Sequence, residues 1–181
     1  MSREQFVQIQ QSVRQTAPRE RGLHQIIGEH ALGFVNLAQA CKQGNMQRMM
    51  DSWIDIDRCN QRWTDLIANG EHLDSPFRLV TSDLVQAYSR ELQSSILHGQ
   101  TTNSLQSVID KESSFYSQLT GHSKDEIKSQ WNAYVDSVGR MISIMNSHGP
   151  DTESFYTCAT DCVRHGQLLG HWLNYKLYHK K

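Results

Sequence analysis

The sequence predicts an all-α fold, an antiparallel helical bundle of about six helices built from three helical hairpins. Apolar residues recur at alternating steps of three and four through most of the chain, which is the spacing of one helix face. Only three prolines, at positions 18, 76 and 150, interrupt the 181 residues, so long helices are permitted between them. Glycines at 44, 99 and 149 then divide the helical stretches into pairs of similar length.

An N-terminal amphipathic arm is expected over residues 1–19. Phe6, Ile9 and Val13 share one face of a short helix that ends before Pro18. The arm either packs along the main body or acts as a detachable docking helix. These three side chains are therefore a candidate interaction surface.

The first hairpin, residues 20–70, should turn at Gly44, and residues equidistant from this turn should share a layer of a coiled-coil pair. The seam residues are Leu23, Ile27, His30, Phe34, Leu37 and Cys41 before the turn, and Met46, Met49, Trp53, Ile56, Asn60, Trp63 and Ile67 after it. The only polar members, His30 and Asn60, then lie opposite each other. Burying either one alone would cost about 1–3 kcal/mol, so the pair should satisfy itself by a hydrogen bond.

The second hairpin, residues 74–121, begins at a Ser-Pro helix start and turns near Gly99. Its apolar stripe contains one acidic residue, Glu112. Counting residues outward from the turn near Gly99 places Glu112 near Tyr88, whose hydroxyl could lie beside the carboxyl group. The other interpretation is that Glu112 lies at the edge of the seam in water.

The third hairpin, residues 123–179, turns at Gly149 and Pro150 and has a second strict seam. Counting from this turn places Tyr134 opposite His165, so the imidazole again meets a residue that can hydrogen-bond to it. The two polar layers, His30 with Asn60 and Tyr134 with His165, either fix the register of the helices or mark a ligand site.

Residues 20–181 are expected to form a single domain with a four-helix core from the first and third hairpins and the second hairpin alongside. The first and third hairpins carry glycines inside helices, where each glycine lowers helix stability by about 1 kcal/mol relative to alanine. Such glycines indicate close approach of two helix backbones. They are Gly28, Gly33, Gly139, Gly166 and Gly170.

Cys158, Cys162 and His165 lie on one face of a helix, at positions i, i+4 and i+7. Thiolate and imidazole, with the thioether of Met141 expected nearby, are ligands that Cu(I) or Zn²⁺ accepts. The same residues occupy a seam whose other members are core residues. The alternatives are therefore a soft-metal site and ordinary core packing.

Composition and motifs exclude several functional classes. The net charge of −1 makes nucleic acid an unlikely partner. No signal-peptide core is present, and the four cysteines favour a reducing compartment, so we expect a cytoplasmic protein. The Glu-x-x-His pair of di-iron bundles is absent, as are phosphate-loop and hydrolase motifs, so no cofactor and no catalytic activity are expected.

The C-terminal stretch interleaves aromatic residues with lysines: Trp172, Tyr175 and Tyr178 are followed or separated by Lys176, Lys180 and Lys181. Such a stretch can lie at a membrane or apolar surface, or stack on single-stranded nucleic acid. Lysines near a helix C-terminus also complement the helix dipole. The three aromatic residues are a second candidate interaction surface.

Residues 45–95 combine glutamine-rich amphipathic helices, a tryptophan-containing helix and a polar break with Ser-Pro. In these compositional features the segment resembles phasins, the helical proteins that coat polyhydroxyalkanoate granules. The resemblance implies contact with an apolar granule or lipid surface and carries over no functional residue. The regular seams and the third hairpin depart from such a coat protein.

The sequence as a whole favours a non-catalytic interaction or assembly protein that binds a protein partner or itself. A phasin-like coat is one alternative. The other is a bundle that binds a ligand or soft metal near His30 or near Cys158, Cys162 and His165.

Overall fold

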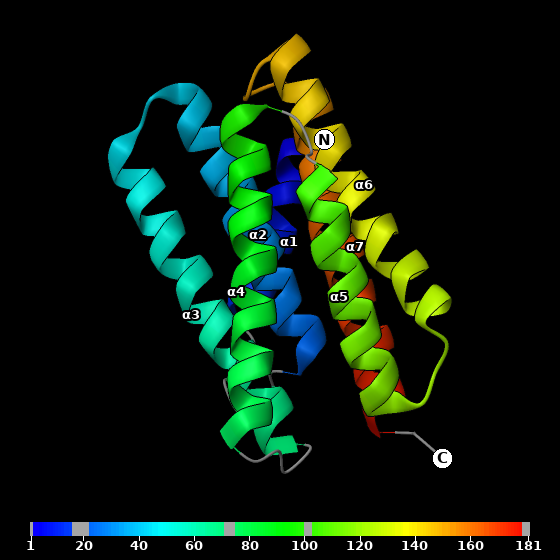
Figure 1. Ribbon diagram of the computed structural model, residues 1–181. Helices are drawn as coiled ribbons and strands as arrows, with labels where there is room; N and C mark the ends of the chain where they lie inside the picture. The colour runs from blue at the N-terminus through cyan, green and yellow to red at the C-terminus, as the bar shows by residue number, and fades with distance from the viewer. Residues whose placement is uncertain (1, 16–21, 71–74, 100–102, 179–181) are drawn as a thin grey trace.

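The computed structural model describes residues 2–15, 22–70, 75–99 and 103–178, and the chain forms only helices and short turns within these ranges. The helices are α1 (Ser2–Gln15), α2 (Leu23–Gln43), α3 (Met46–Gly70), α4 (Ser75–His98), α5 (Asn103–Thr120), α6 (Lys124–His148) and α7 (Glu153–Tyr178). The prediction of an all-α fold is confirmed, and the helices pack together as one bundle (Figure 1).

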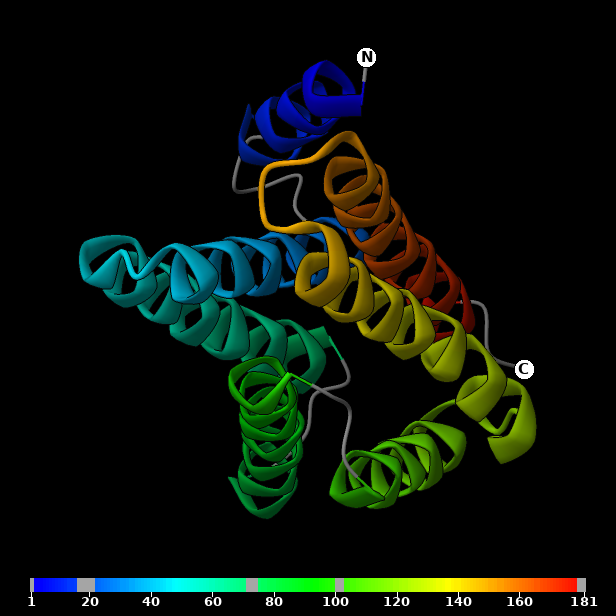
Figure 2. The same ribbon diagram turned by 90° about the horizontal axis from the view of Figure 1, so that it is seen from above.

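Six of the helices form a closed circuit of neighbours. Each helix from α2 to α6 packs against the next in the sequence, and α7 returns to pack against α2. The circuit is visible in Figure 2, in which α1 lies outside it. Most of α2 is buried, because it contacts α3 on one side and α7 on the other. Side chains from the facing helices therefore meet in the middle of the circuit.

The turn between α2 and α3 occurs where the sequence predicted it. Gly44 has a φ of 67°, in the left-handed region that glycine adopts without strain. The backbone N–H of Asn45 donates to the carbonyl of Ala40 at 2.9 Å, which satisfies one of the free carbonyls at the helix end. This short connection fixes the register of the two helices.

The contact between α2 and α7 is a close approach of two backbones. A Cβ atom placed on Gly170 would lie 2.3 Å from the Cα of His24. A Cβ on Gly166, one turn earlier, would lie 3.1 Å from the carbonyl oxygen of Ile27. For these two residues the predicted close approach is confirmed. Glycine is required at position 170 because the obstruction is main chain and cannot rotate away.

Helix α1 is packed onto the outside of the bundle. The ring of Phe6 lies 5.6 Å from the ring of Tyr156 on α7, and the side-chain amide of Gln25 on α2 donates to the Val13 carbonyl. Phe6 and Val13 are buried and Ile9 is half-buried. The interaction surface expected on this arm is therefore covered by the bundle itself.

None of the described helices combines the length and the apolar character that crossing a membrane requires.

Candidate functional site

Aromatic rings fill the middle of the circuit. The ring of Trp131 on α6 lies 6.0 Å from that of Trp63 on α3, 5.5 Å from that of Tyr88 on α4 and 5.7 Å from that of Tyr116 on α5. All four side chains are fully buried. The indole N–H of Trp63 donates to the Tyr116 hydroxyl at 2.7 Å, which joins the first and second hairpins. We call these four residues the aromatic centre.

The polar layer predicted in the first hairpin borders the aromatic centre. His30 Nε2 lies 2.8 Å from Asn60 Oδ1, so the predicted pairing is confirmed. Burial lowers the pKa of His30 to about 4, and the hydrogen bond to Asn60 offsets only part of this effect. The imidazole is therefore neutral at pH 7 and donates from Nε2, because amide oxygen can only accept.

Glu112 on α5 is a buried carboxyl group beside the aromatic centre, with a side chain only 1% exposed. Neither carboxyl oxygen has a hydrogen-bond partner in the part of the chain that the structure describes. Desolvation raises the pKa of Glu112 to about 8. Burial raises the pKa values of Tyr88 and Tyr116, and the nearby carboxyl group of Glu112 adds to this effect. Of the two interpretations from the sequence, the buried position near Tyr88 is confirmed, although no hydrogen bond joins the two residues.

Three other buried polar groups at this place lie close to one another but form no hydrogen bond of ordinary geometry. They are the hydroxyls of Tyr88 and Tyr134 and the indole N–H of Trp131. Buried polar groups in proteins are nearly always hydrogen-bonded, so a cluster of unsatisfied groups requires an explanation. The cluster draws its groups from α4, α5 and α6.

The second predicted polar layer does not form. Tyr134 is fully buried but its hydroxyl has no partner among the described residues, and His165 is only half-buried. The Tyr134 ring passes beside Gly166, where an added Cβ would lie 3.4 Å from Cε2. The ring therefore packs against α7 at Gly166, and its hydroxyl does not bond to His165. The pairing of Tyr134 with His165 was therefore wrong.

The predicted metal ligands are not arranged around a common point. Among the described residues, no group of three or more His, Cys, Asp or Glu side chains could hold a metal ion. Cys162 is buried, and its thiol donates to the carbonyl of Ser137 at 3.1 Å, whereas Cys158 and His165 are half-buried. Burial raises the pKa of Cys162 to about 12, so this thiol remains protonated at neutral pH.

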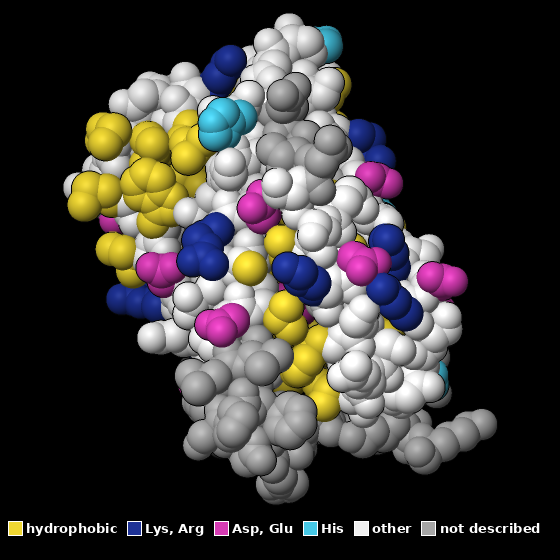
Figure 3. Space-filling view, viewed as in Figure 1, with side chains coloured by type: hydrophobic (Ala, Val, Ile, Leu, Met, Phe, Trp, Pro, Cys, Tyr) yellow, Lys and Arg dark blue, Asp and Glu magenta, His cyan; other side chains and the backbone are white. Residues whose placement is uncertain are grey.

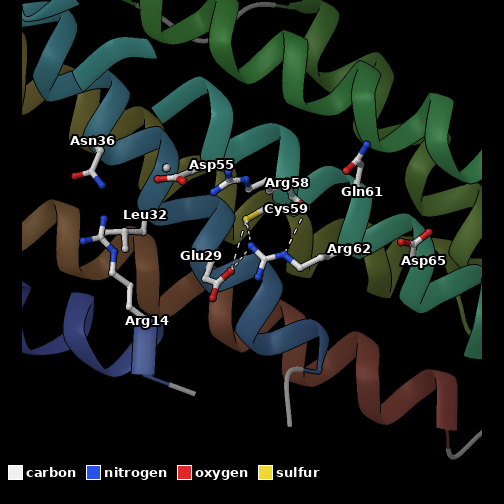
Figure 4. Close-up of a pocket in the computed structure, with 11 residues that line it drawn as sticks. Arg14, Glu29, Leu32, Asn36, Asp55, Arg58, Cys59, Gln61, Arg62 and Asp65 are labelled. Atoms are coloured by element: carbon white, nitrogen blue, oxygen red, sulfur yellow. Dashed lines mark hydrogen bonds and ion pairs between the residues drawn. The ribbon is translucent and has the colours of Figure 1, made fainter. Parts of the chain in front are cut away.

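An open groove of about 560 Å³ lies between α1, α2 and α3 (Figure 4). Opposite charges line it: Arg14, Arg58 and Arg62 on one hand, Glu29, Asp55 and Asp65 on the other. The groove depends on α1, which packs against α2 and α7 and brings Arg14 to its edge, so no pattern within α3 could reveal it.

One ion pair crosses the groove from α3 to α2. Arg62 Nη2 lies 2.6 Å from Glu29 Oε2 and 3.4 Å from the sulfur of Cys59. Burial raises the pKa of Cys59 to about 12, although the neighbouring guanidinium acts in the opposite direction. By contrast, Arg14 and Arg58 form no ion pair with another described residue. These two cations are available to a bound partner.

A row of large apolar side chains on α3 leads into the groove. Met46, Met50 and Ile54, spaced by four residues, are 63%, 52% and 48% exposed. Each step of four turns the row by about 40° around the helix, so its later members, Arg58 and Arg62, face the groove. Figure 3 shows hydrophobic side chains gathered over this part of α3, at the upper left. We call the five residues the α3 ridge.

The position of Met46 corrects the predicted seam, in which it was a core residue. Helix α2 ends at Gln43, so its last seam residue, Cys41, is level with Met49 and no layer remains for Met46. The step-of-four row was visible in the sequence. Met49 and Trp53 on the same helix do pack against the core, so the helix carries two overlapping apolar patterns.

The C-terminal surface predicted from aromatic residues is described only in part. Trp172 is half-buried and packs against the core. The side chains of Tyr175 and Tyr178 lie outside the described residues.

No protein-family model, curated protein or solved structure matches the chain. The functional argument therefore rests on the geometry of the aromatic centre, the groove and the α3 ridge.

Proposed function

We propose that the protein is a non-catalytic interaction protein that binds a protein partner along the α3 ridge and the adjoining groove. The observation that carries the proposal is the exposure of Met46, Met50 and Ile54 in one row. Single exposed apolar residues are ordinary, but a contiguous apolar patch rimmed by charges is typical of a binding surface. Methionine suits such a surface because its unbranched side chain adapts to the partner's shape.

The ridge defines the chemistry of the partner. From Met46 to Arg62 it extends about 24 Å along α3, at 1.5 Å per residue. A partner helix packed along this inclined row would place apolar side chains on the methionine half. Carboxylates at its other end would then meet Arg58 and Arg14, which have no ion pair with a described residue.

We propose a supporting role for the remaining helices. The α2–α3 and α6–α7 hairpins would form a four-helix frame that holds the α3 ridge rigid, and α4 and α5 would complete the circuit. The contacts of α2 with both α3 and α7 support this division. A rigid surface binds more tightly than one that must be ordered on binding.

The test replaces the apolar row and keeps the fold. Met50→Glu combined with Ile54→Glu introduces two charges on the ridge. Leu168→Glu on α7 is the matched control, because Leu168 is 59% exposed and far along the chain from α3. A photo-reactive amino acid at position 47, beside the row, would identify the protein that contacts it. We expect the ridge variant to weaken binding of the identified partner at least tenfold, and the control to leave it unchanged.

Other occupants of the ridge are outcomes of the same test. Crosslinks to a second copy, with sedimentation showing dimers that the ridge variant abolishes, would make the partner the chain itself. Cosedimentation with apolar granules or lipid droplets, lost in the ridge variant, would favour a phasin-like coat over a protein partner. Full binding of the identified partner by the ridge variant would refute the proposal.

A further inference from the structure

Of the methionines that the structure describes, the two exposed ones both lie on the α3 ridge. Met46 and Met50 are 63% and 52% exposed and are four residues apart, about one helical turn. Met49 on the same helix is half-buried and packs against the core, and Met141 and Met145 on α6 are buried. Access from solvent therefore separates the two ridge methionines from the other three.

Two of the three apolar members of the ridge are thus thioethers. Ile54, which is 48% exposed, is the third, and the later members are arginines. Oxidation of a thioether to a sulfoxide places a polar S=O group on a side chain that was apolar. Oxidation of both methionines would leave Ile54 as a single exposed apolar side chain, and such residues are ordinary on protein surfaces.

The thiols of this chain are poor competitors for an oxidant. Thiols react with oxidants as thiolates, so their reactivity follows their pKa and exposure. Cys59 and Cys162 are buried, and burial raises the pKa of each to about 12. Burial also raises the pKa values of the half-buried Cys41 and Cys158. All four are therefore protonated at neutral pH, whereas a thioether needs no deprotonation to react.

We infer that the α3 ridge is an oxidation-sensitive surface, on which peroxide converts Met46 and Met50 to sulfoxides and removes the apolar row without unfolding the bundle. A lone pair of sulfur attacks one oxygen of hydrogen peroxide, and the S–O bond forms as the O–O bond breaks. The proton of the transferred OH group passes to the departing hydroxide, which leaves as water. Sulfur loses two electrons and peroxide gains them.

The modification should act on binding and not on folding. Met46 and Met50 are exposed and lie outside the core cluster, whereas Met141 and Met145 belong to it. A methionine sulfoxide can also be reduced back to the thioether by a sulfoxide reductase, so the change is reversible. Loss of a protein partner on oxidation rests on the proposed function, but the change in the surface itself does not.

The first experiment treats the full chain with hydrogen peroxide at pH 7 and measures sulfoxide formation at each methionine by tandem mass spectrometry of digests. We expect Met46 and Met50 to be oxidised at least tenfold faster than Met141 and Met145 in the folded chain. The four rates should be similar in urea, because unfolding exposes all of these side chains. The Tm should be unchanged when only the two ridge methionines are oxidised.

Retention on a phenyl-agarose column then reports the apolar surface without any partner. The oxidised chain should elute earlier than the untreated chain, and treatment with a methionine sulfoxide reductase should reverse the shift. Met46→Leu combined with Met50→Leu keeps an apolar row without sulfur, so peroxide should not alter its elution. Met49→Leu is the matched control on the same helix and should shift as the unaltered chain does. Binding of the partner crosslinked at position 47 should fall at least tenfold on oxidation, except in the double leucine variant.

Three results with the chain alone would overturn the inference. The first is oxidation of Met46 and Met50 no faster than that of Met141 and Met145. The second is unchanged elution after both ridge sulfoxides have formed, and the third is an equal shift in the double leucine variant.

The partner measurement separates this inference from the proposed function. If oxidation leaves binding intact while Met50→Glu with Ile54→Glu abolishes it, the inference is wrong and the proposed function stands. If the glutamate variant also binds fully, the proposed function is wrong, and the oxidation rates and the column elution still decide the inference.

Discussion

The Nε2 atom of His30 on α2 lies 2.8 Å from the Oδ1 atom of Asn60 on α3, across the seam of the first hairpin. Both side chains are buried. The bond is therefore isolated from water at the level where the hairpin meets the aromatic centre.

Removing one member of this pair should cost more than removing both. Asn60→Ala leaves the His30 N–H buried without an acceptor, and we expect a loss of about 1–3 kcal/mol in the free energy of unfolding, beyond the effect of the cavity. Replacing both residues with leucine should recover much of that loss, because no polar group then remains unsatisfied. Urea unfolding of the two single variants and the double variant measures this coupling. Purely additive losses would contradict the pairing.

Stability should fall in alkaline solution because of Glu112. Its pKa is about 8 in the folded chain and about 4.5 in the unfolded chain, so the folded state holds the extra proton between these values. The unfolding free energy therefore decreases as the pH rises from about 4.5 to 8, by roughly 5 kcal/mol at most. Glu112→Gln should remove the decrease and be more stable than the natural chain at pH 8. Urea unfolding at both pH values tests this, and equal stability of the two proteins at pH 8 would contradict it.

His30 has the opposite pH dependence. Its pKa is about 4 in the folded chain against 6.5 in the unfolded chain, so the unfolded state takes up the proton first. Stability is lost as the pH falls from about 6.5 to 4, by roughly 3 kcal/mol. Between pH 4.5 and 6.5 this effect and that of Glu112 cancel, so the stability curve should be flat there and fall above it. His30→Leu should tilt the flat region, giving higher stability at pH 4.5 than at pH 6.5.

The four cysteines should react with alkylating reagents in two classes. Cys59 and Cys162 are buried, and burial raises the pKa of each to about 12. Cys41 and Cys158 are half-buried, and burial raises their pKa values as well. We expect Cys41 and Cys158 to be modified first by iodoacetamide at pH 8, as read by mass spectrometry of digests. Modification of Cys59 or Cys162 at the same rate in the folded protein would contradict the packing of α3 and α7.

The two polar layers show what turn arithmetic can and cannot predict. It found the partner of His30 because the α2–α3 turn is short and the two helices face each other directly. For Tyr134 the same counting predicted the correct level along the bundle but the wrong partner. Helix α7 also packs against α2, and the ring of Tyr134 turns toward the interior beside Gly166.

The environment of Glu112 could not be decided from the sequence for a related reason. Its position in an apolar stripe was clear, but its burial depends on the neighbouring helices α4 and α6, which both pack against α5. The groove has the same origin, because α1 joins α2 and α3 only in the folded chain. Patterns within one helix identify a buried face. They do not identify which other helices cover it.

The interior glycines provide the sharpest test of the α2–α7 contact, because two of them face different kinds of neighbour. A methyl group on Gly170 would meet the main chain of His24 at 2.3 Å, and this obstruction can be relieved only by moving the helices apart. A methyl group on Gly28 would meet the Cγ of Gln167 at 2.8 Å, and that flexible side chain can rotate away. We expect Gly170→Ala to cost 3 kcal/mol or more, at or above the roughly 1–3 kcal/mol usual for overpacking. Gly28→Ala should be nearly neutral, because alanine gains about 1 kcal/mol in helix propensity. Thermal or urea unfolding of the two variants compares them directly, and equal losses would mean that α2 and α7 do not approach as closely as the structure shows.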